Sequence, residues 1–325
     1  MSIEVGVRKK LLPLCLFIHY KKTFFYPKKG KCFINFFLIH ILIIMTPSNS
    51  PPSVAPEQHH PVRVMSFNIR LNTSSDGYNS WPHRKQMVQS TILFHQADLV
   101  GVQEALHDQM EDLTKLLPDY DFVGVGRSDG LTDGEYSAIW FRRNRFQVLQ
   151  SNTFWLSESP EIPTTGWDAS LPRIVTWVKF HDSYTNQVFF HFNTHLDHRG
   201  EIARVKSAEL IRSKIEQMNP EHLPVLLTGD FNTSPTSNPY RILTEGDGSV
   251  SMSDAKSLSL QPPHGPEGTV SKFQFPGIPG SRIDYIFVKH KVSVLSYATL
   301  SDSWSGRFPS DHLPVIAEVN IGAVS

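Results

Sequence analysis

Cysteine is almost missing from this sequence of 325 residues, because its two cysteines, Cys15 and Cys32, both lie near the beginning. The chain after them therefore has no disulfide framework, no thiolate zinc site and no cysteine nucleophile. If this part of the chain hydrolyses a bond, we expect an activated water molecule to be the nucleophile.

Charged residues are also scarce, since 19% of the residues are charged and the formal net charge is +0. Residues 1–61 hold eight Lys and Arg but two Asp and Glu, so residues 62–325 carry 23 basic and 29 acidic side chains. The resulting net charge of −6 argues against a protein that wraps long nucleic acids, because neutralising phosphates requires Lys and Arg. It does not exclude acidic side chains gathered around a cation.

The apolar run near the N-terminus is too short to cross a membrane. Phe33–Met45 has thirteen residues and is interrupted by Asn35 and His40, whereas a spanning helix needs about 20 residues. Basic residues precede this run. Residues 28–45 therefore fit a signal peptide or weak membrane anchor, a poorly structured basic tail, or a stretch upstream of a translation start at Met45.

Two glycosylation sequons bear on the compartment. They begin at Asn72 and Asn232. Asn232 also lies in GDFN (229–232), a candidate functional motif, where a glycan would block chemistry. We therefore expect a cytoplasmic protein, with the signal peptide or anchor as the alternative. Residues 46–61 are rich in Pro and Ser and predict a linker, so we expect residues 1–61 to lie outside the fold and residues 62–325 to form a single domain.

Strand patterns dominate residues 62–325, with a few helices between them. Strands are predicted over 62–69, 97–105, 120–125, 137–142, 146–155, 174–181, 188–195, 223–231, 282–288, 292–300 and 313–319. Helices are predicted over 80–96, 106–117 and 201–218, with a helical turn at 240–243, and residues 245–281 are loop-like. The pattern indicates an α/β domain of two packed sheets covered by helices, with no internal repeat.

Polar side chains stand at the ends of several predicted buried strands. They are Asn68, Glu104, His195, Asp197, Asp230, Asn232, Asp284, Asp311 and His312. Residues two apart on a strand face the same way, so Asp230 and Asn232 address one point. If the strand ends meet at one edge, either a divalent cation offsets the carboxylates or their pKa values rise. Oxygen ligands without thiolates suit Mg²⁺ or Mn²⁺, and Mg²⁺ points to phosphoryl-ester chemistry.

Six short motifs resemble one known family when taken in order. They are SFNIR (66–70), GVQE (101–104), NTHLDH (193–198), GDFN (229–232), RIDYIF (282–287) and SDHLPV (310–315). In this order they resemble the endonuclease/exonuclease/phosphatase superfamily with its DNase I-like fold, in the branch of the nocturnin and carbon-catabolite-repressor deadenylases. The resemblance implies a four-layer α/β sandwich, in which two mostly antiparallel sheets are flanked by helices.

The resemblance also implies a metal site and a water-activating site. Glu104 would hold the Mg²⁺ ion, or Mn²⁺ in its place, helped by Asn68 and Asp311. Asp230 would orient or deprotonate the attacking water, and Asn232 would hold that water or the phosphate.

Histidines complete the implied catalytic set. His195 would donate to a non-bridging phosphate oxygen, and Asp284 would help to orient the neighbouring groups. Asp311 and His312 would act as a carboxylate–histidine dyad, which fixes the imidazole tautomer and favours its cationic form. The residues alone leave the carboxylate partner of His312 open between Asp311 and Asp284.

Two further residues are candidates for substrate binding. Arg173 opens a predicted strand after Pro172, and its guanidinium would offer two donors to a phosphate. Glu135, in GEYSAI, resembles a stretch of the superfamily branch near the deadenylases and would ligate or shape the site.

The motifs together predict a Mg²⁺-dependent phosphoester hydrolase that uses an activated water. A 3′–5′ exonuclease acting on RNA ends is the first expectation for its substrate. A phosphatase or phosphodiesterase of small nucleotide, sugar or lipid phosphates is the alternative, because no extended basic face for nucleic acid is evident. A non-catalytic binding module is a third hypothesis, disfavoured because no metal or dyad residue is missing. The sequence indicates no protein partner.

Overall fold

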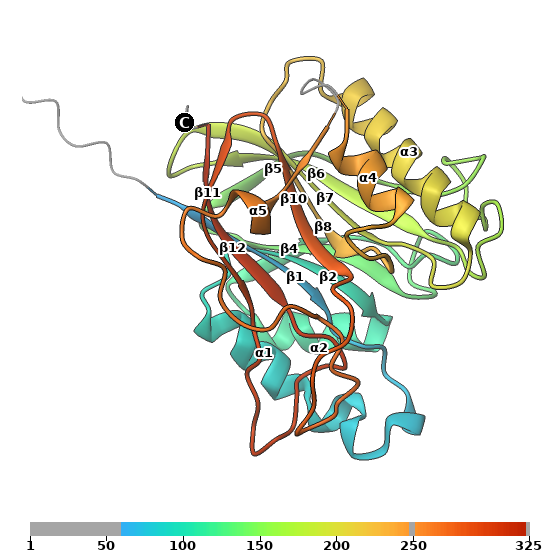
Figure 1. The fold of residues 1–325 in the computed structure, drawn as a ribbon, viewed down its shortest axis with the longest axis vertical. Coiled ribbons are helices and arrows are strands. Elements are labelled where there is room, and N and C mark those ends of the chain that lie inside the picture. The colour runs from blue at the N-terminus through green and yellow to red at the C-terminus, as the bar shows by residue number, and fades with distance from the viewer. Residues whose placement is uncertain (1–59, 247–250, 323–325) are drawn as a thin grey trace, which may run out of the picture. The chain divides into compact units, whose positions relative to one another are not determined.

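The computed structural model describes residues 60–246 and 251–322 (Figure 1). The predictions for residues 28–45 and for most of the linker lie outside these described residues. Within the described part of the chain, no helix combines the length and the apolar character needed to cross a membrane.

Two six-stranded sheets form the centre of the fold (Figure 1). The first has the order β11 (Val292–Thr299), β12 (Val315–Ile321), β1 (Val62–Asn68), β2 (Leu99–Ala105), β4 (Tyr136–Arg142), β3 (Tyr120–Val123). The second has the order β5 (Phe146–Trp155), β6 (Ile174–Asp182), β7 (Gln187–His195), β8 (Val225–Asp230), β10 (Asp284–Lys289), β9 (Ser253–Asp254). Only β1 with β2 and β7 with β8 pair in parallel among these strands. The predicted α/β sandwich of mostly antiparallel sheets is therefore confirmed.

Helices cover the outer face of each sheet (Figure 1). Helices α1 (Lys85–Phe94) and α2 (His107–Leu116) pack on the first sheet, and α3 (Glu201–Met218) and α4 (Asn238–Thr244) pack on the second. The helix predicted over 80–96 is wrong at its start, where the 3₁₀ helix η2 (Trp81–His83) precedes α1. Pro82 lacks an N–H and so fits this first turn. A second 3₁₀ helix, η1 (Ser74–Asn79), and a short α5 (Ala255–Leu258) occupy segments predicted as loops.

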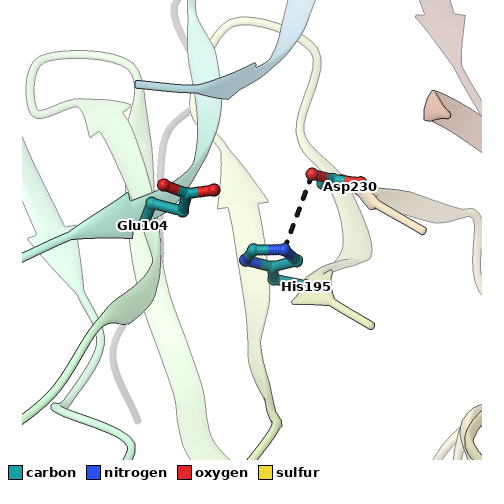
Figure 2. A group of neighbouring side chains, drawn as sticks. All are labelled: Glu104, His195 and Asp230. Carbon is teal, nitrogen blue, oxygen red and sulfur yellow. Dashed lines mark ion pairs between the residues drawn. The ribbon is translucent and has the colours of Figure 1, made fainter. Parts of the chain in front are cut away.

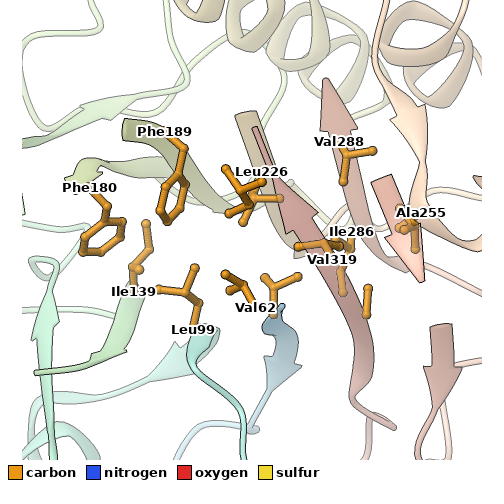
Figure 3. Close-up of a cluster of buried hydrophobic side chains, with 14 of the residues drawn as sticks. Val62, Leu99, Ile139, Phe180, Phe189, Leu226, Ala255, Ile286, Val288 and Val319 are labelled. Atoms are coloured by element: carbon orange, nitrogen blue, oxygen red, sulfur yellow. The ribbon is translucent and has the colours of Figure 1, made fainter. Parts of the chain in front are cut away.

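The main core lies between the two sheets (Figure 3). Leu99 and Ile139 from the first sheet and Phe189, Leu226 and Ile286 from the second are among its buried side chains. Because helices cover the outer faces, strands such as β1 and β8 are buried on both sides. Continuous apolar runs rather than alternating ones follow from this burial.

A polar bridge crosses the core between the sheets. Asn193 on β7 donates from Nδ2 to the carbonyl oxygens of Val102 and Ala138 at 2.9 Å each. Its Oδ1 accepts from Gln103 Nε2 at 2.7 Å and from Thr228 Oγ1 at 3.0 Å. These bonds hold the two sheets together two residues before β7 ends at His195, and so help to fix the distance between their ends.

Candidate active site

Asp230 is the centre of the site, because the register of the second sheet places it between His195 and Asp284. Its side chain is buried, and its Oδ1 accepts from the backbone N–H of Asn232 at 2.9 Å. Its Oδ2 lies 3.5 Å from His195 Nε2 and 3.7 Å from His312 Nε2. Burial and the neighbouring Asp284 raise the pKa of Asp230 to about 7. The predicted convergence of strand ends is therefore present around this carboxylate.

Glu104 faces Asp230 from the first sheet (Figure 2). It occupies a bulge in the pairing of β2 with β4 and has a φ of 65°, a conformation that a non-glycine residue adopts only when its surroundings enforce it. Its Oε1 accepts from Asn68 Nδ2 at 2.9 Å, and its Oε2 accepts from the N–H of Leu71 at 3.1 Å. These two bonds orient both oxygens of the carboxylate.

Asn68 links the two carboxylates. Its Nδ2 donates to Glu104 and also to Asp230 Oδ2 at 3.0 Å, while its Oδ1 accepts from the backbone N–H of Arg70 at 3.0 Å. The amide oxygen that would ligate a metal is therefore engaged with the backbone, and in this structure Asn68 orients the carboxylates.

His312 has Asp284 as its carboxylate partner, which resolves the alternative that the sequence left open. Its Nδ1 lies 2.9 Å from Asp284 Oδ2. Burial alone would lower the pKa of His312, but Asp284 and Asp230 outweigh it and hold that pKa well above its usual value. Asp311 instead lies 4.0 Å from the Arg70 guanidinium, and burial raises the pKa of its carboxyl.

His195, which lies beside Asp230 (Figure 2), differs from His312 in its charge state. Burial and the charges of Arg173 and Arg127 lower its pKa well below the usual value, so its ring is neutral at pH 7. Asn232 Nδ2 donates to the carbonyl oxygen of Leu196 at 3.0 Å and lies 3.1 Å from His195 Nε2. The amide orientation makes Nε2 an acceptor, so we place the ring proton on Nδ1.

Glu135 borders the site beside His195. Its Oε2 lies 3.8 Å from His195 Nδ1. Arg127 binds both oxygens of Glu135, at 2.7 and 2.8 Å. Arg127 was missed because it lies between the predicted strands 120–125 and 137–142, in a segment for which the sequence predicts no helix or strand. The sequence holds one signal for it, an arginine eight residues before the candidate Glu135.

Arg173 is buried, and much of its guanidinium is already engaged. Its Nε donates to Asp197 Oδ2 at 3.2 Å, and its Nη2 lies 3.0 Å from His198 Nδ1. Its Nη1 is buried and has no hydrogen-bond partner within the described chain. Nη1 is therefore the guanidinium nitrogen without a protein partner in the described chain, while Nη2 keeps one of its two N–H groups.

Arg70 and Arg84 hold the side of the site around Glu104, and neither was among the predicted site residues. Arg70 binds Asp76 through Nε and Nη2 at 3.0 and 3.1 Å, and its Nη1 lies 3.8 Å from Glu104. Buried Arg84 donates to backbone carbonyl oxygens on both sides of this region. Arg70 had a signal, since it ends the SFNIR motif, whereas Arg84 lies outside the six motifs and its hydrogen-bond acceptors are backbone carbonyl oxygens.

The donor set fits a divalent cation. Ligand atoms of Glu104, His195 and Asp230 lie within 4.8 Å of one another, as do those of Asp230, Asp284 and His312. Burial is the main cause of the raised pKa values of Asp230 and Asp311, and the neighbouring carboxylates Asp284 and Glu104 raise them further. A cation between them would relieve this repulsion and favour their ionised forms.

Comparisons with known proteins identify the family of this chain. The Endonuclease/Exonuclease/phosphatase family matches residues 65–312. The structure of an endonuclease/exonuclease/phosphatase from Bacteroides vulgatus is 40% identical, with a TM-score of 0.76, and covers 81% of this chain and 99% of that chain. A mannosyl-6-phosphatase from Bacteroides thetaiotaomicron is 36% identical, with a TM-score of 0.75, and covers 79% and 99%. Human nocturnin is 25% identical over 297 residues.

The fold and the site define an enzyme that hydrolyses phosphoester bonds. The chain belongs to the endonuclease/exonuclease/phosphatase family, whose members generally use divalent metals. Its relatives include nocturnin and carbon catabolite repressor proteins, as the motifs predicted. The nocturnin match covers 81% of this chain but 66% of nocturnin, just under two thirds of that protein.

Proposed function

We propose that this enzyme is a Mg²⁺-dependent phosphatase of small phosphate monoesters, with Mn²⁺ as a substitute ion. The observation that carries this proposal is the pairing of the arginines that border the site. Arg70, Arg127 and Arg173 bind Asp76, Glu135 and Asp197, respectively. A polynucleotide backbone is bound mainly by cations that are free to neutralise successive phosphates. Paired arginines, and a net charge of −6 over residues 62–325, favour a small ligand.

The carboxylates would hold the ion and the water. Glu104 and Asp230 would bind the divalent cation, which polarises the phosphoryl oxygens when it is present. Asp230 also lies where it would accept a proton from the attacking water, because Asn232 fixes its other oxygen. Asn68 donates to Glu104 and Asp230 and so holds the spacing between them.

The two histidines would act in different charge states. Asp284 holds Nδ1 of His312, so the Nε2–H of a cationic ring points toward Asp230 and would stabilise charge that develops on the phosphoryl oxygens. His195 is neutral, and its unprotonated Nε2, beside Asn232 and 3.5 Å from Asp230 Oδ2, suits accepting a hydrogen bond from the water. A cation on one side and a neutral ring on the other distinguish the two faces of the phosphate.

The relatives support a phosphatase and keep a second candidate open. The mannosyl-6-phosphatase is similar over nearly its whole length at 36% identity. A 3′–5′ RNA exonuclease is the second candidate, because the similarity to nocturnin extends over 297 residues at 25% identity. Both reactions would use the same ion, water and histidines, so the substrate alone separates them.

A direct assay separates the two candidates. The full chain with Mg²⁺ is incubated with mannose 6-phosphate, p-nitrophenyl phosphate and a 5′-labelled oligo(A), and phosphate release and oligonucleotide length are measured. We expect phosphate release from the monoesters, loss of activity in EDTA and recovery with Mg²⁺. Shortening of oligo(A) without monoester hydrolysis would overturn the phosphatase in favour of the exonuclease.

Matched variants test the site in the same assay. Glu104→Gln should lower the rate at least roughly 100-fold, because it removes an ionised ligand. Glu318→Gln is the control, since Glu318 lies on β12 and pairs with Arg63 at 3.8 Å away from the site. Equal losses in the two variants would contradict the assignment of Glu104 to the metal.

A further inference from the structure

The loop that follows β7 is held rigidly by one buried carboxylate. Asp197 Oδ1 accepts from the N–H groups of Arg199 and Gly200 at 2.9 and 2.7 Å. Its Oδ2 accepts from the N–H and Oγ of Ser170 at 3.1 and 2.9 Å, and from Arg173 Nε at 3.2 Å. Five donors on one carboxylate fix the backbone around His198, which is itself exposed. The loop therefore presents the His198 ring from a preorganised position.

Arg173 determines which nitrogen of His198 carries a proton. Its Nη2 lies 3.0 Å from His198 Nδ1, and a guanidinium only donates hydrogen bonds. Nδ1 is therefore the acceptor, the ring is neutral, and Nε2–H is the donor that this exposed side chain offers. Burial and Arg173 also lower the pKa of His198, which keeps this tautomer at neutral pH.

The Arg173–His198 pair lies next to the catalytic histidine. His198 follows His195 by three residues, and Arg173 immediately precedes β6, which pairs with β7 up to Thr194. Arg173 Nη1 is buried, and among residues 60–246 and 251–322 no atom accepts a hydrogen bond from it, so its N–H groups lack an acceptor. Two N–H donors, one buried and one exposed, thus stand beside the site on the His195 side.

We propose that Arg173 Nη1 and His198 Nε2–H form a subsite for the alcohol part of the substrate, and that this part carries hydroxyl groups, as in a sugar phosphate. The proposal rests on the proposed phosphatase function. Hydroxyl oxygens accept hydrogen bonds from both donors without bringing a further charge. A second phosphate is disfavoured here, because the Arg173 charge is already balanced by Asp197 and the His198 ring is neutral. An apolar alcohol would leave Nη1 unpaired.

The test compares two substrates of one enzyme. Mannose 6-phosphate presents hydroxyl groups to the subsite, and p-nitrophenyl phosphate presents none. We expect His198→Phe to raise KM for mannose 6-phosphate about tenfold with little change in kcat, since one hydrogen bond is lost on binding. The kcat/KM for mannose 6-phosphate divided by that for p-nitrophenyl phosphate should fall by a similar factor. His198→Gln should restore part of this ratio, because Gln keeps an N–H donor.

Control measurements separate this role from a structural one. His181→Phe, at the opposite end of β6, should leave the substrate ratio as in the wild type. Histidine ¹⁵N NMR of the full chain should show the Nε2–H tautomer at His198, and Arg173→Lys should shift it. A His198→Phe loss that is equal for both substrates, or absent for both, would overturn the subsite. If the wild type hydrolyses neither monoester, both the phosphatase function and the subsite are refuted. If the wild type hydrolyses both and His198→Phe leaves the ratio of the two kcat/KM values unchanged, the subsite alone is refuted.

Discussion

Replacing Arg84 with Met tests whether one buried cation holds the metal-facing loops together. Its three guanidinium nitrogens donate to carbonyl oxygens of Ile69, Arg70, Leu71, Asn79 and Pro309. Burial lowers its pKa to about 10, so it remains charged at pH 7, and its guanidinium packs on the Trp81 ring. The side chain thus joins the segment after β1 to the segment before Asp311.

The expected loss follows from these contacts. At about 1.5 kcal/mol for each donating nitrogen, Arg84→Met should cost about 4–5 kcal/mol of unfolding free energy. In a domain of this size that corresponds to a fall in Tm of roughly 10–15 °C. The loops that orient Glu104 and Asp311 should also loosen, so the Mg²⁺ concentration for half-maximal activity should rise about tenfold or more.

Arg145→Met is the matched control. Arg145 is also buried, binds Asp182 at 2.9 and 3.1 Å, and donates to the carbonyl oxygens of His60 and Pro61 at the opposite end of β1. It should show a similar fall in Tm with unchanged Mg²⁺ dependence. Thermal unfolding and initial rates against Mg²⁺ concentration measure both effects. Wild-type Mg²⁺ dependence in Arg84→Met, or an equal shift in Arg145→Met, would refute the reasoning.

Two further predictions concern histidines. Asp284→Asn and His312→Ala should each lower kcat roughly 10²–10³-fold. The double variant should lose far less than the product of the two single losses, because the pair acts as a unit. A double-variant loss equal to that product would show that the two residues act independently. Burial lowers the pKa of His191 to about 3. The unfolded chain binds this proton from about pH 6.5 downward, whereas the folded chain binds it only near pH 3. The free energy of unfolding should therefore fall by about 1.4 kcal/mol for each unit by which the pH decreases between these values. Urea unfolding of His191→Gln should show a flatter acid limb, and an unchanged slope would contradict the assignment.

The fold was predictable where one local pattern decided the structure. Continuous apolar runs that end in polar residues marked β1, β2, β7, β8 and β10, because helices cover these strands and only their ends reach the site. The start of the helix predicted over 80–96 was missed, since Pro82 interrupts a pattern that otherwise continues. The short β9 and α5 were missed as well, because they are too short to show a period.

The candidate site was predictable as a set of residues but not as a set of contacts. The partner of His312 is Asp284, 28 residues away, rather than its neighbour in sequence. The orientation of the Asn68 amide depends on the N–H of Arg70, which no motif expresses. Arg84 was hidden for a similar reason, because its partners are backbone carbonyls and any residue type supplies those.

The position of β12 has a consequence for the order in which the enzyme acquires activity. This strand inserts between β11 and β1, and the segment before it carries Asp311 and His312. Ser310 donates to the carbonyl oxygen of Asn68 at 2.7 Å and so joins the end of the fold to its first strand. A nascent chain that has reached only residue 309 would contain Glu104, Asp230 and Asp284 but no cationic histidine among them. Hydrolysis would then begin only after β12 has been synthesised, and the onset of catalysis during synthesis would report that β12 has docked between β11 and β1.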